Sequence, residues 1–230
     1  MEPTAPVLFL LGASHHTAPL AVREKLALDE ARAAALAAQL QSTPGVREFA
    51  FLNTCNRVEV YGVATAASVD RLAATVGEVT GCTAAELTGV LTARHGHNVL
   101  EHLFAVAAGL DSQVVGETEI LGQVKTAYDA ALARHWTGPV LNRVFQKGFQ
   151  AAKHVRTTTA ITEGQVSVAN VAVDLALNIF GGLKEARILL LGAGEIGEKT
   201  AKAFQSRGAA ALTVANRRFE RAMELATALA

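Results

Sequence analysis

Cysteine is scarce in this 230-residue chain, which has only Cys55 and Cys82, and neither belongs to a CxxC or zinc-ligand pattern. We therefore expect no disulfide framework and no metal site, and a reducing compartment is favoured. Long hydrophobic runs are also missing. The apolar run at 7–11 is too short to span a membrane, and no basic segment of a signal peptide precedes it. The sequence predicts a cytoplasmic protein without a membrane segment.

Net charge is likewise absent, since 21 basic residues balance 21 acidic ones, and aromatic residues make up only 5% of the chain. A nucleic acid would therefore have to be bound by a local patch rather than by a global field. Half of the residues are hydrophobic, with alanine and leucine dominant. That composition predicts a helix-rich α/β protein with one large domain or two ordinary ones.

Hydrophobic periodicity divides the chain into three parts: a small α/β catalytic domain with a helical bundle (1–161), a long connector helix (162–183) and the first part of a Rossmann-type domain (184–230). In the first part the pattern predicts strands at 7–11, 48–52 and 58–63 and helices at 20–41, 68–80 and from 84. It predicts a bundle of short helices over 98–156, interrupted by Gly109, Gly116, Gly122 and Gly138.

The connector helix is expected to begin with a capping box at Thr162-Glu163-Gly164-Gln165 and to end at Phe180. Strands at 186–191 and 211–215 then alternate with a helix that the segment 192–197 opens and that runs to about 207, and with a helix from 219, which is the βαβα order of a doubly wound sheet. Two parallel strands do not complete a dinucleotide site. We therefore expect a truncated chain.

A glycine-rich turn, Gly192-Ala193-Gly194-Glu195-Ile196-Gly197, lies between the first strand and helix of this last part. In that context GxGxxG is typical of a turn that binds a pyrophosphate at the helix N-terminus. Asn216-Arg217-Arg218 follow the second strand, where an NAD-binding fold has an acidic residue. Guanidinium groups there favour NADPH. A tight turn without ligand and a solvated pair of arginines are the alternatives.

Cys55 lies in a polar loop, Asn53-Thr54-Cys55-Asn56-Arg57, between two predicted strands. Cysteine is most often a small buried hydrophobic residue, and Cys82 fits that description. Beside Cys55, however, a cation would stabilise the reactive thiolate. If the loop is extended, Arg57 lies on the same face and a substrate carboxylate on Arg57 would lie next to the sulfur.

Two further segments carry polar residues without a unique interpretation. The segment 109–117 crowds glycine and polar side chains together, with His102 upstream, although a lone histidine is more often structural and Glu117, Glu119 and Gln123 are typical of a solvated face. The segment 130–162 contains no acidic residue but five Arg or Lys. It is equally suited to a phosphate backbone and to solvent.

Taken together, the motifs resemble glutamyl-tRNA reductase, the enzyme that begins the five-carbon route to tetrapyrroles (porphyrins). The similar segments are GASHHTAPLAVREKLA, LNTCNRVEVY, HLFAVAAGLDSQVVGETEILGQVKTAY, SVANVAVDLA, LLLGAGEIGEKTAKAF and VANRR. The resemblance implies that Cys55 attacks glutamyl-tRNA(Glu) to form a thioester, which NADPH reduces to glutamate-1-semialdehyde. A thioester is easier to reduce than an ester, so one hard step becomes two easier ones.

The resemblance also implies roles for other residues. His102 would act beside the thiol, Thr54, Arg57 and Ser112 would hold the glutamyl group, and Glu117 and Gln123 would belong to the same pocket. It further implies a homodimer formed through a C-terminal domain, with glutamate-1-semialdehyde aminomutase as a downstream partner. The chain departs from the family pattern at Arg218, where threonine is usual, and at Glu119, where glutamine is common.

Two other functions fit the same residues. An NADP-dependent dehydrogenase of a small metabolite would transfer hydride directly to a carbonyl, and Cys55 would then be incidental. A tRNA-binding or regulatory module would bind charged tRNA without forming an acyl adduct. Replacing Cys55 and looking for that adduct distinguishes these readings.

Overall fold

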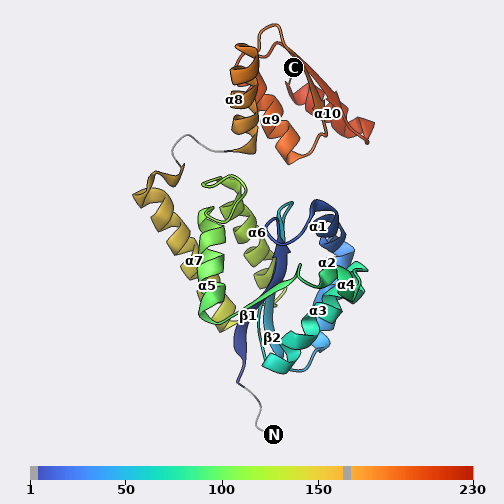
Figure 1. The fold of residues 1–230 in the computed structure, drawn as a ribbon, viewed down its shortest axis with the longest axis vertical. Helices are drawn as coiled ribbons and strands as arrows, with labels where there is room; N and C mark the ends of the chain where they lie inside the picture. The colour runs from blue at the N-terminus through green and yellow to red at the C-terminus, as the bar shows by residue number, and fades with distance from the viewer. Residues whose placement is uncertain (1–4, 163–166, 230) are drawn as a thin grey trace. The chain divides into compact units, whose positions relative to one another are not determined.

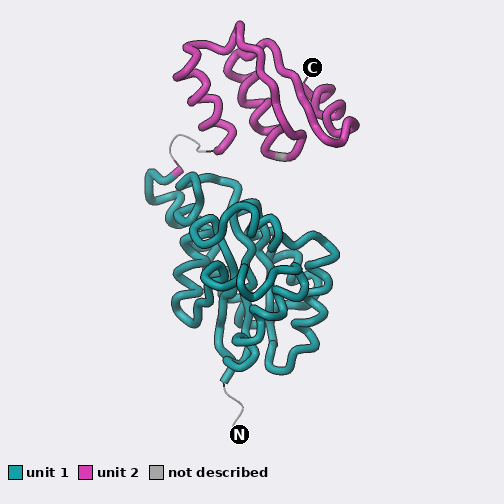
Figure 2. The backbone as a smooth tube through the Cα atoms, turned by 45° about the vertical axis from the view of Figure 1, so that its right-hand side comes forward, with its two compact units in different colours: residues 1–161 teal, residues 162–230 magenta. Residues whose placement is uncertain are grey.

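The chain folds into two compact units, residues 1–161 and 162–230 (Figure 2). The computed structural model describes residues 5–162 and 167–229. Each unit has its own hydrophobic core. The mixed α/β class predicted from the composition is confirmed, and none of the helices in the described residues has both the length and the hydropathy that a membrane span requires.

The first unit is built on a four-stranded antiparallel sheet in the order β2-β3-β1-β4. Three of its strands were predicted and are confirmed with longer ends: β1 (Val7–Ser14), β2 (Val46–Asn53) and β3 (Arg57–Ala64). The fourth, β4 (Thr92–His95), was not predicted. Its sequence, TARH, has no apolar alternation, and it becomes a strand by pairing with β1.

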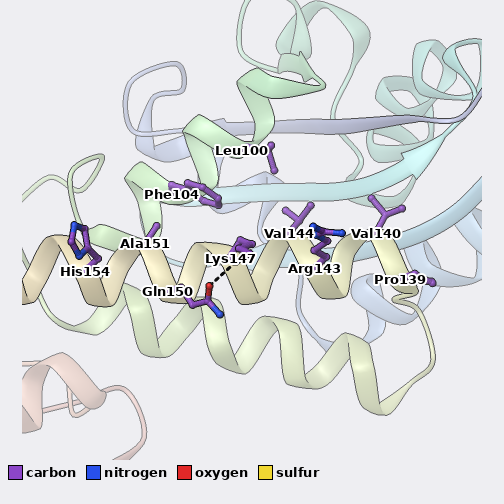
Figure 3. Close-up of a pocket in the computed structure, with 10 residues that line it drawn as sticks. All are labelled: Leu100, Phe104, Pro139, Val140, Arg143, Val144, Lys147, Gln150, Ala151 and His154. Atoms are coloured by element: carbon purple, nitrogen blue, oxygen red, sulfur yellow. Dashed lines mark hydrogen bonds between the residues drawn. The ribbon is translucent and has the colours of Figure 1, made fainter.

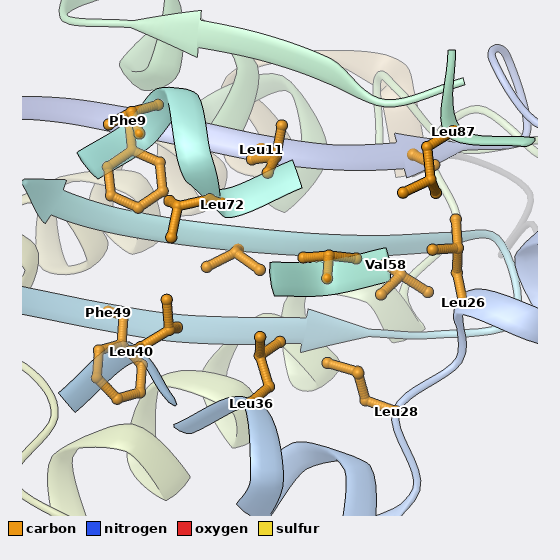
Figure 4. Close-up of a cluster of buried hydrophobic side chains, with 14 of the residues drawn as sticks. Phe9, Leu11, Leu26, Leu28, Leu36, Leu40, Phe49, Val58, Leu72 and Leu87 are labelled. Carbon is orange, nitrogen blue, oxygen red and sulfur yellow. The ribbon is translucent and has the colours of Figure 1, made fainter. Parts of the chain in front are cut away.

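Helices cover both faces of this sheet (Figure 1). On one face lie α1 (Leu20–Leu26), α2 (Glu30–Ser42), α3 (Ala66–Thr80) and α4 (Ala84–Leu87); on the other lie α5 (His97–Ala108), α6 (Glu119–Ala133) and α7 (Pro139–Thr158). The alternation of β1 decides which core each residue joins, since Phe9 and Leu11 face α1–α4 (Figure 4) whereas Leu10 faces α5–α7.

Two helix predictions in the first unit were wrong. The helix expected over 20–41 is two helices, because Asp29 caps the start of α2 by accepting a hydrogen bond from the backbone N–H of Arg32 at 2.8 Å. The bundle over 98–156 does not consist of short helices, since α7 has 20 residues and Gly122 lies inside α6. Gly109, by contrast, ends α5 in the left-handed conformation that favours glycine.

A short 3₁₀ helix, η1 (Ala160–Thr162), closes the α-helical part of the first unit. The next helix, α8 (Val168–Phe180), begins with Ser167, whose hydroxyl accepts from the Asn170 N–H at 3.1 Å. Thr162 is therefore not its N-cap, and the other members of the predicted capping box, residues 163–165, lie outside the described residues.

The second unit has the predicted βαβα order. Its elements after α8 are β5 (Arg187–Leu191), α9 (Glu195–Ser206), β6 (Ala211–Ala215) and α10 (Phe219–Leu229). The strands β5 and β6 are parallel, with Leu191 opposite Ala215. Val173 of α8 packs with Leu183 and with Phe204 of α9, so α8 belongs to the core of this unit. The unit is Rossmann-like, as the sequence predicted.

Candidate active site

Cys55 lies in a tight turn between β2 and β3. The Thr54 hydroxyl accepts hydrogen bonds from the backbone N–H groups of Asn56 and Arg57, at 3.2 and 3.1 Å. Arg23 on α1 donates to the Cys55 carbonyl at 2.7 Å and to the Asn56 side chain at 3.2 Å. The turn is thus held from inside and from α1, and it leaves the Cys55 side chain exposed.

This geometry corrects the expectation of an extended loop. Arg57 is the first residue of β3, and its side chain is only 1% exposed, whereas Cys55 faces solvent. The two residues therefore do not share one extended face. Cys82, in contrast, is buried against the α1–α4 face of the sheet, as its sequence context suggested.

A buried ionic cluster lies below the turn, on the sheet face that packs against α5. Arg57 donates to the Glu59 carboxylate at 2.8 Å and to the Asp111 carboxylate at 3.1 Å, and it also donates to the Asp111 carbonyl. Glu59 accepts from the Tyr61 hydroxyl at 2.7 Å and contacts His102 Nε2 at 2.9 Å. One guanidinium and one imidazole therefore share two carboxylates.

The charges in the cluster stabilise one another. Burial raises the pKa of Glu59, but the hydrogen bond with His102 and the charge of Arg57 outweigh it and leave that pKa below its ordinary value. Asp111 behaves in the same way, because Arg57 offsets the cost of burial and lowers its pKa. Burial and the nearby Glu59 carboxylate raise the pKa of Tyr61. Glu59 and Asp111 are thus held ionised and Tyr61 is held protonated.

Glu59 also fixes the orientation of His102. Because an ionised carboxylate only accepts hydrogen bonds, the 2.9 Å contact makes Nε2 the donor. A neutral His102 then keeps its lone pair on Nδ1, which lies 3.8 Å from the Asp111 carboxylate, beyond a hydrogen bond. The second oxygen of Asp111 is 3.0 Å from Nε2 of His16, which lies in the segment between β1 and α1.

Residues 109–118 form a loop between α5 and α6, where the sequence had suggested helix. Ser112 donates to the Glu117 carboxylate at 3.3 Å, and the same carboxylate accepts the Glu119 and Ile120 N–H groups at the start of α6, at 2.7 and 3.2 Å. Arg156 of α7 donates to the Glu117 carbonyl at 2.7 Å. These bonds hold the loop that carries Asp111.

The predicted pocket residues are therefore distributed over two adjoining parts of the first unit. Arg57 and His102 meet at Glu59, and Thr54 shapes the turn that carries Cys55. Ser112 and Glu117 hold the neighbouring loop, whereas Gln123 is half-buried on α6 without a contact to that cluster among the described residues.

The glycine-rich turn of the second unit has the geometry of a phosphate-binding turn. Gly192 has φ +107°, and Gly194 is the N-cap of α9. A Cβ on Gly197 would lie 2.5 Å from the Gly192 carbonyl oxygen, so only glycine permits this close approach. Ala193 and Ile196 belong to the same turn and first helical turn, while the side chain of Glu195 lies outside the described part of the structure.

Of the three predicted residues after β6, Asn216 contacts this turn. The Asn216 side chain accepts from the Ala193 N–H at 3.3 Å and donates to the Arg218 carbonyl at 2.8 Å. Asn216 therefore links the end of β6 to the glycine-rich turn. Arg217 and Arg218 are exposed. The turn, the helix N-terminus and two exposed guanidinium groups fit the phosphates of a dinucleotide.

Several members of the site were missed from the sequence: Glu59, Tyr61, Asp111, His16 and Arg23. For two of them a signal exists, because the alternation of β3 places Arg57, Glu59 and Tyr61 on one face. Asp111 stood within the polar segment 109–117 but was not singled out. No local pattern connects His16 or Arg23 with the Cys55 turn.

Comparison with known proteins matches both units to known families. The family model of the glutamyl-tRNA(Glu) reductase N-terminal domain matches residues 11–159, which is well over half of the chain. The chain belongs to the glutamyl-tRNA reductase family. A second model, of shikimate / quinate 5-dehydrogenase, matches residues 174–230, in the Rossmann-like unit.

Individual members of the glutamyl-tRNA reductase family are similar over nearly the whole chain. The protein of Akkermansia muciniphila is 43% identical over 219 residues, covering 94% of this chain and 64% of its own length. That of Desulfotalea psychrophila is 46% identical over 226 residues, covering 95% and 51%. The solved structure of glutamyl-tRNA reductase from Methanopyrus kandleri has a TM-score of 0.64 at 36% identity, covering 100% of this chain and 53% of that one. The chain thus spans about half to two thirds of the length of these relatives.

Proposed function

We propose that this chain forms the catalytic part of an NADPH-dependent reductase that converts glutamyl-tRNA(Glu) to glutamate-1-semialdehyde, the first step of tetrapyrrole synthesis by the five-carbon route. Residues 1–161 form the catalytic domain, 162–183 the connector and 184–230 the start of the NADPH domain. The observation that carries this proposal is an exposed Cys55 in a turn fixed by Arg23 and Thr54, within the region matched by the glutamyl-tRNA reductase model.

Cys55 is the nucleophile of the first half-reaction. Its thiolate attacks the ester carbonyl carbon of the glutamyl group, the bond from that carbon to the ribose oxygen breaks, and the tRNA leaves with a proton on that oxygen. A glutamyl thioester on Cys55 remains. Arg23 supports this role, since its guanidinium donates to the Cys55 carbonyl at 2.7 Å and fixes the turn that presents the thiol.

His102 handles the proton in this step. With Nε2 donating to Glu59, a neutral imidazole has Nδ1 available to accept a proton from the thiol and to return it to the leaving oxygen. Glu59 is a positioning residue, because it acts through His102. Arg57 in turn compensates the charge of Glu59 in the buried cluster.

The glutamyl group brings a side-chain carboxylate and an ammonium group. Thr54, Arg57, Ser112, Glu117 and Gln123 are proposed to hold it. Arg57 already holds two carboxylates, so a substrate carboxylate reaches it only by taking the place of Asp111. Asp111 would then be free to accept from the substrate ammonium group.

NADPH, when bound, supplies the hydride that reduces the thioester to the aldehyde. Gly192, Gly194 and Gly197 let the backbone approach its pyrophosphate, together with Ala193, Glu195 and Ile196 at the start of α9. Asn216 fixes the turn, and Arg217 and Arg218 are suited to the 2′-phosphate.

The aldehyde product is reactive, so the proposal includes its transfer to an aminomutase that consumes it. The relatives are longer than the region that they share with this chain. We include in the proposal a homodimer formed through a C-terminal domain outside the shared region.

The proposal is tested by trapping the glutamyl thioester on Cys55. Purified chain incubated with [¹⁴C]glutamyl-tRNA(Glu) should retain label that hydroxylamine releases, and peptide mapping should place the label on Cys55. Cys55→Ser should abolish this hydroxylamine-sensitive label, whereas the matched variant Cys82→Ala should keep it. Binding of charged tRNA without any adduct would favour a tRNA-binding module instead.

The match of residues 174–230 to shikimate / quinate 5-dehydrogenase keeps a second candidate open, namely direct hydride transfer to a small carbonyl compound. In that case Cys55→Ser in a version extended to the relatives' full length should retain nearly all reductase activity. Loss of activity in Cys55→Ser, with retention in Cys82→Ala, excludes it.

A further inference from the structure

Helix α7 carries an unusual charge pattern. It contains Arg143, Lys147, Lys153 and Arg156 and no acidic residue, whereas every other α-helix of the first unit contains at least one Asp or Glu. Among the described residues, Arg143, Lys147 and Lys153 have no carboxylate within 4 Å, and all three are exposed. No described carboxylate of the unit thus neutralises their positive charge.

Four of the polar side chains of α7 follow one line along the helix. Arg143, Lys147 and His154 fall at positions i, i+4 and i+11, with Gln150 between them at i+7, and Lys147 donates to Gln150 at 3.0 Å (Figure 3). At 1.5 Å per residue this line is roughly 17 Å long. It presents hydrogen-bond donors in a row of the kind that a phosphate backbone requires.

The row borders a groove of about 840 Å³ between α5 and α7. Phe104 and Leu100 of α5 form one wall, and Val140, Val144 and Ala151 of α7 form the floor (Figure 3). An aromatic ring and aliphatic side chains next to cations are suited to the faces of riboses and bases beside the phosphates. The groove is therefore more than a solvated basic face.

The groove and the catalytic cluster lie on opposite sides of α5. Leu100 and Phe104 point into the groove, whereas His102, about 200° around the helix from each of them, meets Glu59. The loop that carries Asp111 is tied to α7 by Arg156, two residues beyond His154, which donates to the Glu117 carbonyl. A ligand in the groove thus lies roughly one helix diameter, about 10 Å, from the cluster.

We propose that the α5–α7 groove is the surface on which this chain seats the backbone of its tRNA substrate, with Arg143, Lys147 and His154 on successive phosphates. The inference rests on the proposed function. It is needed because the chain has no net charge, so a local patch must attract a polyanion. Among the described α-helices of the first unit, α7 is the one without an acidic residue, and it provides that patch.

The test compares two double variants that remove the same charge. Arg143→Gln with Lys147→Gln alters the groove, and Arg47→Gln with Arg71→Gln alters exposed cations on other elements of the same unit. Binding of uncharged tRNA(Glu) is measured by fluorescence anisotropy from 50 to 300 mM salt, and acylation of Cys55 is measured against glutamyl-tRNA concentration.

We expect the groove variant to bind tRNA about tenfold or more weakly and its log Kd against log salt slope to fall by roughly 1.4 to 1.8, the loss of two phosphate contacts. The acylation defect should lie mainly in the half-saturating tRNA concentration. Arg143→Lys with Lys147→Arg should restore binding, and the control pair should change it less than threefold.

Equal effects of the two double variants, or no effect of the groove variant, would overturn the assignment of this surface to tRNA. Tight binding of a Glu-rich amphipathic peptide that the groove variant abolishes, with tRNA binding unchanged, would also overturn it and assign the groove to a protein. These results are distinct from failure of the proposed function, in which the unaltered chain forms no thioester on Cys55.

Discussion

Glu59→Gln perturbs the buried cluster with little change in shape. The Glu59 carboxylate accepts hydrogen bonds from Arg57, Tyr61 and His102, and its side chain is only 3% exposed. The amide keeps the volume but removes the charge that compensates Arg57, and breaking a buried ion pair costs about 3–5 kcal/mol. Because Asp111 still faces Arg57, we expect a loss near 3 kcal/mol, which for a unit of this size lowers Tm by roughly 6–12 °C.

The stabilisation that Glu59 provides should depend on pH and should be lost in acid. The folded-state pKa of Glu59 lies below its ordinary value of 4.5, so its contribution to stability is fully present above pH 4.5 and is lost as the pH falls through the folded pKa. The difference in unfolding free energy between the parent chain and Glu59→Gln should thus be full at pH 7 and shrink below pH 4.5. Urea unfolding at a series of pH values measures it.

A stability difference that stays constant from pH 7 into the acid range would refute this account of the cluster. Glu101→Gln is the matched control, since Glu101 is an exposed carboxylate on α5, and we expect a change within about 0.5 kcal/mol. At pH 7 acylation of Cys55 should fall about 100-fold in Glu59→Gln, because His102 loses its fixed tautomer. Normal acylation in a destabilised Glu59→Gln would remove Glu59 from the reaction.

Three further substitutions test single contacts. Glu48→Gln should cost about 1–2 kcal/mol in urea unfolding, because this buried carboxylate accepts two backbone N–H groups at the start of α7. Asp29→Ala should cost about 1 kcal/mol by removing the cap hydrogen bond from Arg32, and Asp29→Asn should retain most of it. Gly197→Ala should cost about 1–3 kcal/mol, since the new Cβ would lie 2.5 Å from the Gly192 carbonyl; in a version extended to the relatives' full length it should also abolish NADPH binding in titration calorimetry, and unchanged binding would contradict this.

The elements that the sequence predicted well are those whose pattern is local. Parallel βαβ units and the strands β1–β3 have apolar periods that define them without tertiary information. The break between α1 and α2 was missed because the Ala/Leu pattern runs through it, although Asp29 is a cap residue by type. The strand β4 was missed because only its pairing with β1 makes it a strand.

In the candidate site, too, the sequence predicts local motifs but not contacts between distant parts of the chain. Cys55 and the glycine-rich turn are local motifs that the sequence singles out, although the expected extended loop around Cys55 is a tight turn in the structure. The cluster is non-local: Arg57 meets Asp111 across 54 positions of the chain, and His102 meets Glu59 across 43. No periodicity in one sequence relates positions so far apart, since α5 and the 109–118 loop bring them together only when the sheet forms.

Burial changes what the position of Arg57 beside Cys55 implies about its partners. From its place two residues after Cys55, a free guanidinium ready for a substrate carboxylate was the natural expectation. At 1% exposure, however, an uncompensated cation would cost several kcal/mol, so a buried arginine on β3 requires carboxylates of its own. Glu59 and Asp111 satisfy it, and Asp111 is the one on a loop rather than on a strand. If one partner is to yield its place to a substrate carboxylate, it is therefore Asp111, because Glu59 is fixed within the sheet by Tyr61 and His102.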